Sequence, residues 1–305
     1  TITCGGLGRV VASNHLNYQK NDIVHGTINW TEYTIVKTEN MLRKLDAIEF
    51  PLSYHVGIFG TSGFTAYGGF FKICKPKKED KVFVSAAAGS VGNLVGQYAK
   101  LFGCYVVGCA GTKQKVSYSL FHAPIMKSMI DFKKPKQGKI MVSDIDLVKD
   151  EVINIGDVYM LGIHAKQFTL EVDTRFKRGR YFPDGIDIYF DNVGGEMLEV
   201  ANMNALGRIA SYGVISDYTN SRKHTTLSMT SSTRESCMIQ GFLVSDFSAN
   251  DYNDFMSMTR DYVRAGKLCV LEDISCGVES IPSAFVGLFR GDKVGKRIVQ
   301  IDKDS

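Results

Sequence analysis

The sequence lacks any apolar run that could cross a lipid bilayer. A membrane-spanning helix needs roughly 18 or more apolar residues in a row, and none of the 305 residues begins such a stretch. The first residues also lack the basic segment and the continuous apolar segment of a secretion signal. Lys and Arg are scattered, giving a net charge of only +4 and no basic block. We therefore expect a soluble protein that binds small molecules, with no nucleic acid or membrane as partner.

Paired cysteines and clustered metal ligands are missing too. The seven cysteines are odd in number and form no Cys-x-x-Cys pair, which argues against a disulfide framework and a structural zinc knot. None of the six histidines lies in a closely spaced ligand motif, so we expect no bound metal. Free thiols suit a reducing compartment, and the sequence therefore predicts a cytoplasmic protein.

What is present is the composition of a globular protein with one or two cores, 44% hydrophobic and 22% charged. Residues 1–50 contain short β-branched segments divided by Gly and Asn, which predict a mainly β domain. The chain opens without a methionine, so we expect N-terminal residues of this domain to be missing. Residues 51–257 alternate apolar strands with amphipathic helices, the pattern of a doubly wound parallel α/β sheet. Residues 258–305 complete the chain with the end of a helix and a closing strand.

A turn of small residues joins a strand to a helix near the start of the second domain. The strand KVFVS ends at Ser85, and residues with helical spacing follow until a second strand, CYVVG. A dinucleotide pyrophosphate binds to the backbone amides at a helix N-terminus. The side chains of the turn must be small, so that the pyrophosphate can come close to these amides. The candidate residues are Ala86, Ala87, Ala88, Gly89, Ser90, Val91 and Gly92. Tight strand-to-helix packing alone also selects glycine, so packing is the alternative explanation.

No acidic residue follows the second strand. In NAD sites a carboxylate about 20 residues beyond the turn accepts hydrogen bonds from the ribose, whereas a 2′-phosphate favours a cation. Here Cys109, Ala110 and Gly111 are followed by Lys113 and Lys115. An acid would repel the phosphate about as strongly as a lysine attracts it, so the pattern favours NADP. The alternative is that both lysines merely begin a solvated helix.

Several separated motifs together carry a family resemblance. They are PLSYHVGIFGTSGFTAYGGFF, KVFVSAAAGSVGNLVGQYAK, YFPDGIDIYFDNVGGEML, LEDISCGVESIPSAFVGLF and VGKRIVQ. The chain resembles the zinc-independent medium-chain dehydrogenase/reductases, in particular the plant NADPH-dependent 2-alkenal (double-bond) reductases and the leukotriene or prostaglandin reductases. The resemblance implies a Rossmann domain over residues 51–257 and a GroES-like, mainly β domain over residues 1–50 that the chain re-enters at residues 258–305. It also implies a homodimer that reduces the C=C bond of α,β-unsaturated aldehydes and ketones.

The resemblance assigns roles to individual residues. The turn from Ala86 to Gly92 would hold the pyrophosphate, and Gly111 with Lys115 would hold the 2′-phosphate. Tyr218 matches the catalytic tyrosine and would stabilise enolate charge on the substrate oxygen, together with the cofactor ribose. The other matches are Asn192, Tyr212 and Tyr218 beside the cofactor, Phe242, Leu243 and Val244 beside the nicotinamide, and Tyr159 in the substrate pocket. Tyr212 and Phe242 could instead be core aromatics, and Asn192 part of a simple turn.

The chain departs from the family at two places. Lys293 stands in GDKVGK where the family has an asparagine, and residues 117–176 are longer than the corresponding family segment. The latter contains Tyr159 in a sequence that resembles a part of the N-terminal domain, so it is either an insertion or the result of an altered order of segments. Two alternatives to an enone reductase stay open, the first because it would share the cofactor turn and the second because of these departures. One is a quinone oxidoreductase of the same superfamily, and the other is a catalytically silent NADPH-binding protein.

Overall fold

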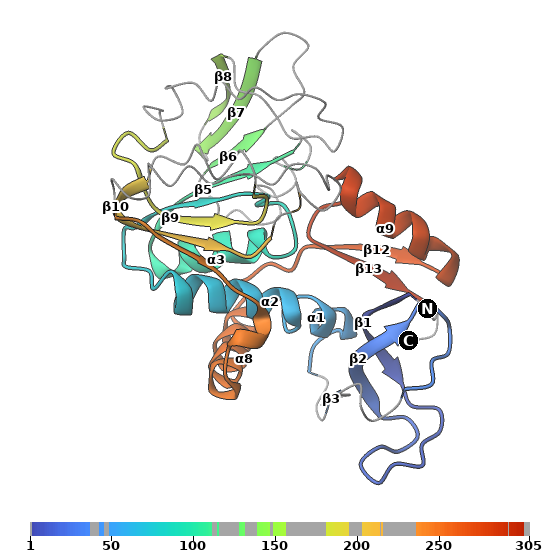
Figure 1. The fold of residues 1–305 in the computed structure, drawn as a ribbon. Coiled ribbons are helices and arrows are strands. Elements are labelled where there is room, and N and C mark those ends of the chain that lie inside the picture. The colour runs from blue at the N-terminus through green and yellow to red at the C-terminus, as the bar shows by residue number, and fades with distance from the viewer. Residues whose placement is uncertain are drawn as a thin grey trace.

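The computed structural model describes residues 2–36, 43–45, 49–111, 115, 128–131, 139–146, 149–156, 181–194, 203–213, 215, 236–291 and 293–301. Within them the strands form sheets of three, eight and two strands. In Figure 1 the eight-stranded sheet with its helices forms one part of the molecule and the three-stranded sheet another, and the two-stranded sheet lies between them. No helix in the described part of the chain has the length and apolar content of a membrane span.

The three-stranded sheet is antiparallel and lies at the N-terminal end of the chain. It consists of β1 (Thr3–Arg9), β2 (Ile23–Asn29) and β3 (Arg43–Lys44), in that order. Ile23 and Val24 are buried, whereas most of β1 is exposed or half-buried. An antiparallel sheet with one solvated face agrees with the expectation of β structure in residues 1–50.

The eight-stranded sheet has the order β11-β10-β9-β4-β5-β6-β7-β8. The six strands from β11 to β6 are parallel to one another, and β7 and β8 add an antiparallel edge within the long segment 117–176. The doubly wound parallel sheet expected from the sequence is therefore confirmed for six strands. Their bounds are β4 (Lys81–Val84), β5 (Tyr105–Ala110), β6 (Ser128–Asp131), β7 (Lys139–Asp146), β8 (Lys149–Gly156), β9 (Ile186–Asp191), β10 (Met203–Ser211) and β11 (Met238–Gly241).

Both faces of the central strands are covered. Along β4, Val82 and Val84 belong to a cluster that packs on the helices, while Phe83 belongs to a second cluster on the opposite face. This burial on both sides explains why the strand reads as a continuous apolar run rather than an alternating one. The helical cluster includes the fully buried Tyr98, whose hydroxyl lies 2.9 Å from Thr259 Oγ1.

The helices against the first cluster are α1 (Leu52–Val56), α2 (Thr61–Tyr67), the π-helical continuation η2 (Gly68–Ile73), α3 (Gly92–Phe102) and α8 (Ala249–Arg264). Figure 1 shows α2 and α3 side by side below the sheet. Helix α8 begins with a capping box between Ser248 and Asp251. Its buried face includes Phe255 and Met256, and the helix runs through residue 257. A domain boundary at 257 would therefore fall inside a helix.

The C-terminal part of the chain returns from α8 to the turn that follows β4. Its elements are β12 (Glu272–Cys276), the 3-10 turn η4 (Val278–Ser280), α9 (Ile281–Arg290) and β13 (Lys296–Gln300). Strands β12 and β13 pair in parallel, with Glu272 beside Lys296. The short 3-10 turn η3 (Val244–Asp246) follows β11 and leads into α8. An isolated bridge joins Gly295 to Gly89, so the end of the chain contacts the turn after β4.

Candidate active site

The sequence-predicted cofactor residues follow the carboxyl ends of five neighbouring parallel strands. The turn that starts at Ala86 follows β4, Gly111 follows β5, Asn192 follows β9, Tyr212 follows β10 and Phe242 follows β11. Since these strands are parallel neighbours, their carboxyl ends meet along one edge of the sheet. The chain proceeds from β4 to β5 in one direction and places β9 on the other side of β4, so the edge contains a topological switch point. Ligands of open α/β sheets bind at such a point.

The turn after β4 is closed by its own backbone. Ala86 adopts a left-handed backbone with φ 47°, a conformation that costs an L-residue about 1 kcal/mol. This conformation lets the Ala86 carbonyl accept a 2.8 Å hydrogen bond from the N–H of Gly89. The Gly89 carbonyl accepts a 2.6 Å bond from Asn93 Nδ2, and the Ser90 hydroxyl donates to Ser62 Oγ at 2.7 Å. These carbonyl and hydroxyl oxygens are therefore hydrogen-bonded within the protein. The positive N-terminal end of α3 can attract an anion at this turn.

Gly92 sits where the helix presses on the turn. A Cβ atom there would lie 2.5 Å from the Ala86 carbonyl oxygen and 3.0 Å from Ala87 Cα, which real Cβ atoms do not tolerate. At Gly89 the nearest atom to a Cβ would be the same oxygen at 3.1 Å, and nothing else lies close. The two glycines therefore serve different needs. Gly92 is required for packing inside the protein, and Gly89 leaves an open approach of the kind a pyrophosphate requires.

A buried polar network after β9 connects two strand ends. The Asp191 carboxylate is fully buried and accepts hydrogen bonds from Ser85 Oγ (3.1 Å), Tyr189 Oη (2.8 Å) and the N–H of Gly194 (3.1 Å). Burial raises the pKa of Asp191, although the backbone N–H groups and hydroxyls oppose this shift. Asn192 is tied to the same place, since its N–H donates to Ser85 Oγ at 2.8 Å and its Nδ2 donates to the Ser85 carbonyl at 2.7 Å.

The sequence analysis did not identify Ser85 and Asp191. Both directly flank residues that it did identify. Ser85 follows the last residue of β4 and Asp191 ends β9, and this position at the ends of parallel strands is the signal that could have found them. The hydrogen bonds that Asn192 donates to Ser85 hold it beside the residue that precedes the turn. Asn192 is therefore more than part of a simple turn, because its side chain fixes the spacing between the ends of β4 and β9.

The residues that follow β10 and β11 differ in how far they are buried. Phe242 is buried and belongs to the main core cluster, where its ring centroid lies 6.1 Å from Phe190 and 5.6 Å from Tyr212. Tyr212 is only partly buried. Leu243 is 63% exposed and Val244 is partly buried. Phe242 therefore packs in the core, and its place beside the nicotinamide stays a prediction, whereas the Leu243 side chain is exposed to solvent.

The end of β5 has the properties expected for NADP. Cys109 and Ala110 are buried, Gly111 is exposed, and a Cβ on Gly111 would meet no atom within 4 Å. No carboxylate lies in this described stretch from Cys109 to Gly111. Lys115 lies close by in the chain, and its Nζ reaches to 3.4 Å from the position of a Cβ on Gly291. Burial raises the pKa of Cys109 to about 12, so this thiol stays neutral and adds no negative charge.

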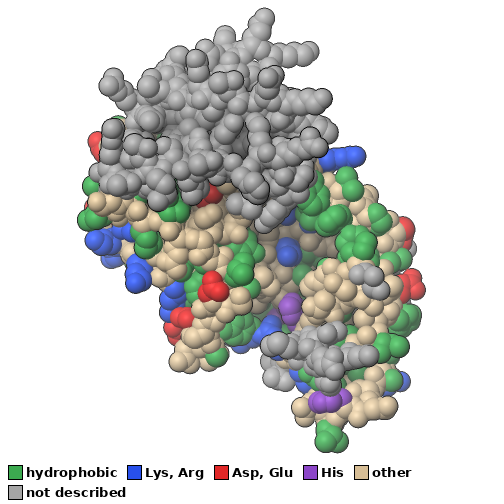
Figure 2. Space-filling view, in the orientation of Figure 1, with side chains coloured by type: hydrophobic (Ala, Val, Ile, Leu, Met, Phe, Trp, Pro, Cys, Tyr) green, Lys and Arg blue, Asp and Glu red, His purple; other side chains and the backbone are tan. Residues whose placement is uncertain are grey.

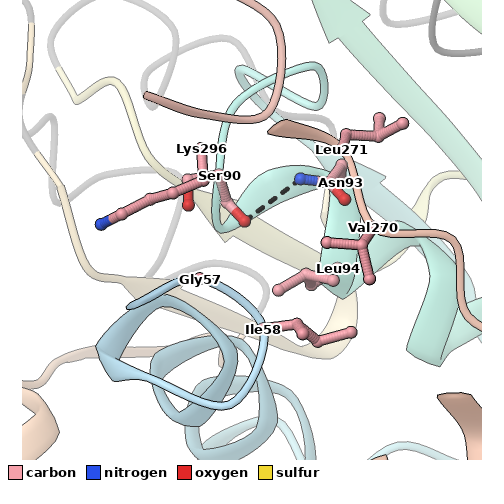
Figure 3. Close-up of a pocket in the computed structure, with 8 residues that line it drawn as sticks. All are labelled: Gly57, Ile58, Ser90, Asn93, Leu94, Val270, Leu271 and Lys296. Carbon is pink, nitrogen blue, oxygen red and sulfur yellow. Dashed lines mark hydrogen bonds between the residues drawn. The ribbon is translucent and has the colours of Figure 1, made fainter. Parts of the chain in front are cut away.

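The C-terminal segment contacts the turn that follows β4. The N–H of Gly295 donates to the Ala88 carbonyl at 2.8 Å, and the N–H of Lys296 donates to the Leu271 carbonyl at 2.8 Å. Beside them lies the small pocket of Figure 3, lined by Gly57, Ile58, Ser90, Asn93, Leu94, Val270, Leu271 and Lys296. The Lys296 side chain extends away from Val270 in this view. Figure 2 shows a hollow between the large sheet and the small β sheet, with cationic and histidine side chains on its wall.

Three predicted residues lie outside the described part of the chain. They are Tyr218, Tyr159 and Lys113, and their proposed roles stay predictions. Among the described residues no group of three or more His, Cys, Asp or Glu side chains is arranged to hold a metal ion.

Comparisons with known proteins give a consistent result. No model of a protein family matches the chain. The chain is 39% identical to (+)-pulegone reductase of Mentha piperita, over 100% of this chain and 79% of that protein. It is also 39% identical to 2-alkenal reductase (NADP(+)-dependent) of Nicotiana tabacum, over 99% of this chain and 78% of that protein. The crystal structure of CurA in complex with NADPH from Vibrio vulnificus aligns with a TM-score of 0.77 at 28% identity, covering 99% of this chain and 80% of CurA.

The fold and the site define a dinucleotide-dependent oxidoreductase of the Rossmann class. With relatives this similar over nearly its whole length, the chain belongs to the zinc-independent, NADP(H)-dependent medium-chain dehydrogenase/reductases. The resemblance stated from the sequence motifs is thus confirmed, and so is the NADP cofactor.

Proposed function

We propose that this chain reduces the C=C bond of α,β-unsaturated aldehydes and ketones with NADPH. The observation that carries the proposal is the turn from Ala86 to Gly92. It leaves an open approach at Gly89, where a Cβ would meet only one oxygen at 3.1 Å, and it lies at the switch point of the sheet, next to a strand end without a carboxylate. The substrate class comes from the names of two relatives, 2-alkenal reductase and (+)-pulegone reductase.

The chain's residues would hold the cofactor as follows. The turn from Ala86 to Gly92 holds the pyrophosphate at the N-terminus of α3, and Gly111 and Lys115 face the 2′-phosphate. Asn192 is held at the same edge by Ser85, which supports a place beside the cofactor. The aromatic pair of Tyr212 and Phe242 forms the floor below the nicotinamide. Leu243 and Val244 continue this floor toward the exposed side.

When bound, NADPH supplies a hydride to the β-carbon of the conjugated double bond. Negative charge then develops on the carbonyl oxygen of the substrate, and Tyr218 donates a hydrogen bond to that oxygen. A proton from solvent then adds to the α-carbon and gives the saturated carbonyl compound. Its position shortly after the end of β10 supports this role, since parallel sheets place functional residues on such loops. Tyr159 is proposed as a residue of the substrate pocket on the strength of the family resemblance alone.

Oxidation of NADPH by a panel of alkenals, cyclic enones and quinones tests the proposed function. We expect turnover with alkenals and enones and release of the saturated carbonyl product, identified by mass spectrometry. Turnover of quinones alone would instead assign the chain to the quinone oxidoreductases. Tight NADPH binding without turnover of any compound would identify a catalytically silent binding protein.

We also propose the domain organisation and the setting of the enzyme. With the boundary moved from residue 257 to the end of α8, the antiparallel sheet β1–β3 and the C-terminal segment after Arg264 form parts of a GroES-like domain, and residues 51–264 form the Rossmann domain. The cysteines of the described structure are all free thiols, which supports a cytoplasmic location. The homodimer expected from the family is tested by light scattering coupled to size-exclusion chromatography.

A further inference from the structure

Two amide side chains are buried one helical turn apart on the inner face of α3. Asn93 is 2% exposed and Gln97 is 0% exposed. Residues four apart are neighbours on a helix surface, and Gln97 Nε2 donates a hydrogen bond to Asn93 Oδ1 at 3.2 Å. Neither side chain carries a charge, so their hydrogen-bond partners determine how the two amides are oriented.

Gln97 is held by the segment that leads into β12. Its Oε1 accepts a hydrogen bond from the N–H of Cys269 at 2.8 Å, and its Nε2 donates to the Cys269 carbonyl at 3.0 Å. An amide oxygen only accepts and an amide nitrogen only donates, so these two bonds permit one orientation of the Gln97 amide. Since Nε2 is also the atom that contacts Asn93, the oxygen of the Asn93 amide must face Gln97.

The nitrogen of the Asn93 amide consequently faces the turn that follows β4. It donates to the Gly89 carbonyl at 2.6 Å and to the Ser90 carbonyl at 3.1 Å, and Figure 3 shows the bond between Asn93 and Ser90. The Gly89 carbonyl already accepts a 3.1 Å bond from the N–H of Asn93. The side chain is therefore not needed to satisfy this carbonyl, and its additional bond fixes the direction in which the carbonyl points.

The direction of these carbonyls sets the direction of two backbone N–H groups. In a trans peptide unit the C=O and the N–H point in opposite directions. Because the carbonyls of Gly89 and Ser90 point at the buried Asn93 side chain, the N–H groups of Ser90 and Val91 point away from it. Neither N–H has a backbone acceptor among the residues that the structure describes. N–H groups at a helix N-terminus that have no partner of their own are the donors that phosphate groups use.

We propose that Asn93 is a positioning residue for the cofactor, which directs the N–H groups of Ser90 and Val91 toward the pyrophosphate, and that Gln97 holds Asn93 in this orientation. The inference rests on the placement of the pyrophosphate at this turn in the proposed function. Through Gln97 the backbone of Cys269, far along the chain, supports the turn. The bond from the N–H of Gly295 to the Ala88 carbonyl is a second support from the C-terminal part of the chain.

Titration calorimetry on the full chain, with NADPH and with NADH, tests the role of Asn93. Asn93→Leu removes both donors and keeps a side chain of similar size. We expect it to weaken both cofactors by a similar factor of about tenfold, because hydrogen bonds to a charged group are lost in part. Gln97→Met should weaken both cofactors by about threefold and also lower the Tm, since the buried Cys269 backbone groups lose their partner.

Thr259→Val is the matched control. The Thr259 hydroxyl is buried 2.9 Å from Tyr98 Oη, so this variant removes a polar contact from the same helix α3 without touching the turn. It should lower the Tm and leave the Kd of both cofactors unchanged. A general loss of stability is thereby distinguished from a loss of positioning.

Asn93→Asp provides a pH profile that packing alone would not produce. When protonated, the carboxyl keeps one donor for the turn, and when ionised it has none and repels the two carbonyls. NADH affinity relative to the unaltered protein should therefore be largely retained at low pH and be lost as the pH rises through the pKa of the new carboxyl. NADH is used because it lacks the 2′-phosphate, which itself titrates near about pH 6.

The outcomes separate this inference from the proposed function. Equal affinities of Asn93→Leu and the unaltered protein for both cofactors would refute the positioning role, as would an Asn93→Asp profile that parallels that of the unaltered protein. A loss confined to NADPH would place the effect at the 2′-phosphate and overturn the pyrophosphate assignment. Enone turnover is measured separately: its absence from the unaltered protein would refute the proposed reduction, whereas a tenfold loss of both cofactors in Asn93→Leu would still support the role of Asn93.

Discussion

The two glycines of the nucleotide turn should respond in opposite ways to the same substitution. In Gly92→Ala the new methyl group lies 2.5 Å from the Ala86 carbonyl oxygen, about 1 Å short of a comfortable contact of roughly 3.5 Å. Overpacking of this kind lowers the free energy of unfolding by about 1–3 kcal/mol. Alanine also makes the unfolded chain stiffer than glycine does, which restores about 0.4–1 kcal/mol. We expect a net loss of about 1–2 kcal/mol and a Tm lower by about 2–6 °C.

In Gly89→Ala the methyl group meets one oxygen at 3.1 Å and otherwise open space. The small strain is offset because alanine lowers the conformational entropy of the unfolded chain. The Tm should therefore change by less than about 2 °C. The methyl group, however, occupies the approach of the pyrophosphate. We expect NADPH binding to weaken by about 1–3 kcal/mol, which is roughly 5- to 150-fold in Kd.

Thermal melting and NADPH titration of both variants provide the assay. The reasoning is refuted if Gly92→Ala melts at the temperature of the unaltered protein, since helix α3 would then not press on the turn. An unchanged Kd in Gly89→Ala would show that the pyrophosphate does not approach the turn at this residue.

Three further predictions concern the cofactor, the metal and the catalytic tyrosine. NADPH should bind at least about tenfold more tightly than NADH, and Lys115→Ala should reduce this difference in affinity. Equal affinities by calorimetry would contradict the proposal that the residues after β5 bind the 2′-phosphate. Activity should survive prolonged treatment with EDTA or phenanthroline, and elemental analysis that finds about one zinc per chain together with lost activity would contradict this. Tyr218→Phe should lower kcat by about tenfold to 100-fold, with NADPH affinity changed far less, because the hydroxyl acts chiefly in the transition state. If Tyr218 only packs, the Phe variant will keep full turnover while Tyr218→Ala lowers the Tm.

The nucleotide turn could be predicted because its signals are local. A buried strand, a turn of small residues and a helix follow one another within Val82 to Phe102, and each leaves its own periodicity or composition in the sequence. The absence of an acid after β5 is equally local. These features require no knowledge of the rest of the chain, and the structure arranges them as the pattern indicates.

Contacts between distant segments could not be predicted in this way. Ser85 and Asn192 are 107 residues apart and meet only because β4 and β9 become neighbours in the sheet. The sequence also left open whether Phe242 is a core aromatic, and only the folded chain brings its ring against Phe190, 52 residues earlier. Spacing along the chain contains no information on which strands pair, so such roles depend on topology.

The sequence by itself therefore determined the Rossmann unit, the NADP cofactor and the family, since strand and helix periodicity, small turn residues and a missing carboxylate act over short ranges. Only the tertiary structure decided that Gly92 is needed for packing and that Gly89 leaves room for the pyrophosphate. These roles depend on the distance from each glycine to Ala86. It also decided that Gly295, between α9 and β13, lies against Ala88. The physical reason is that such contacts depend on separation in space, which the chain establishes only when distant segments fold back onto the turn.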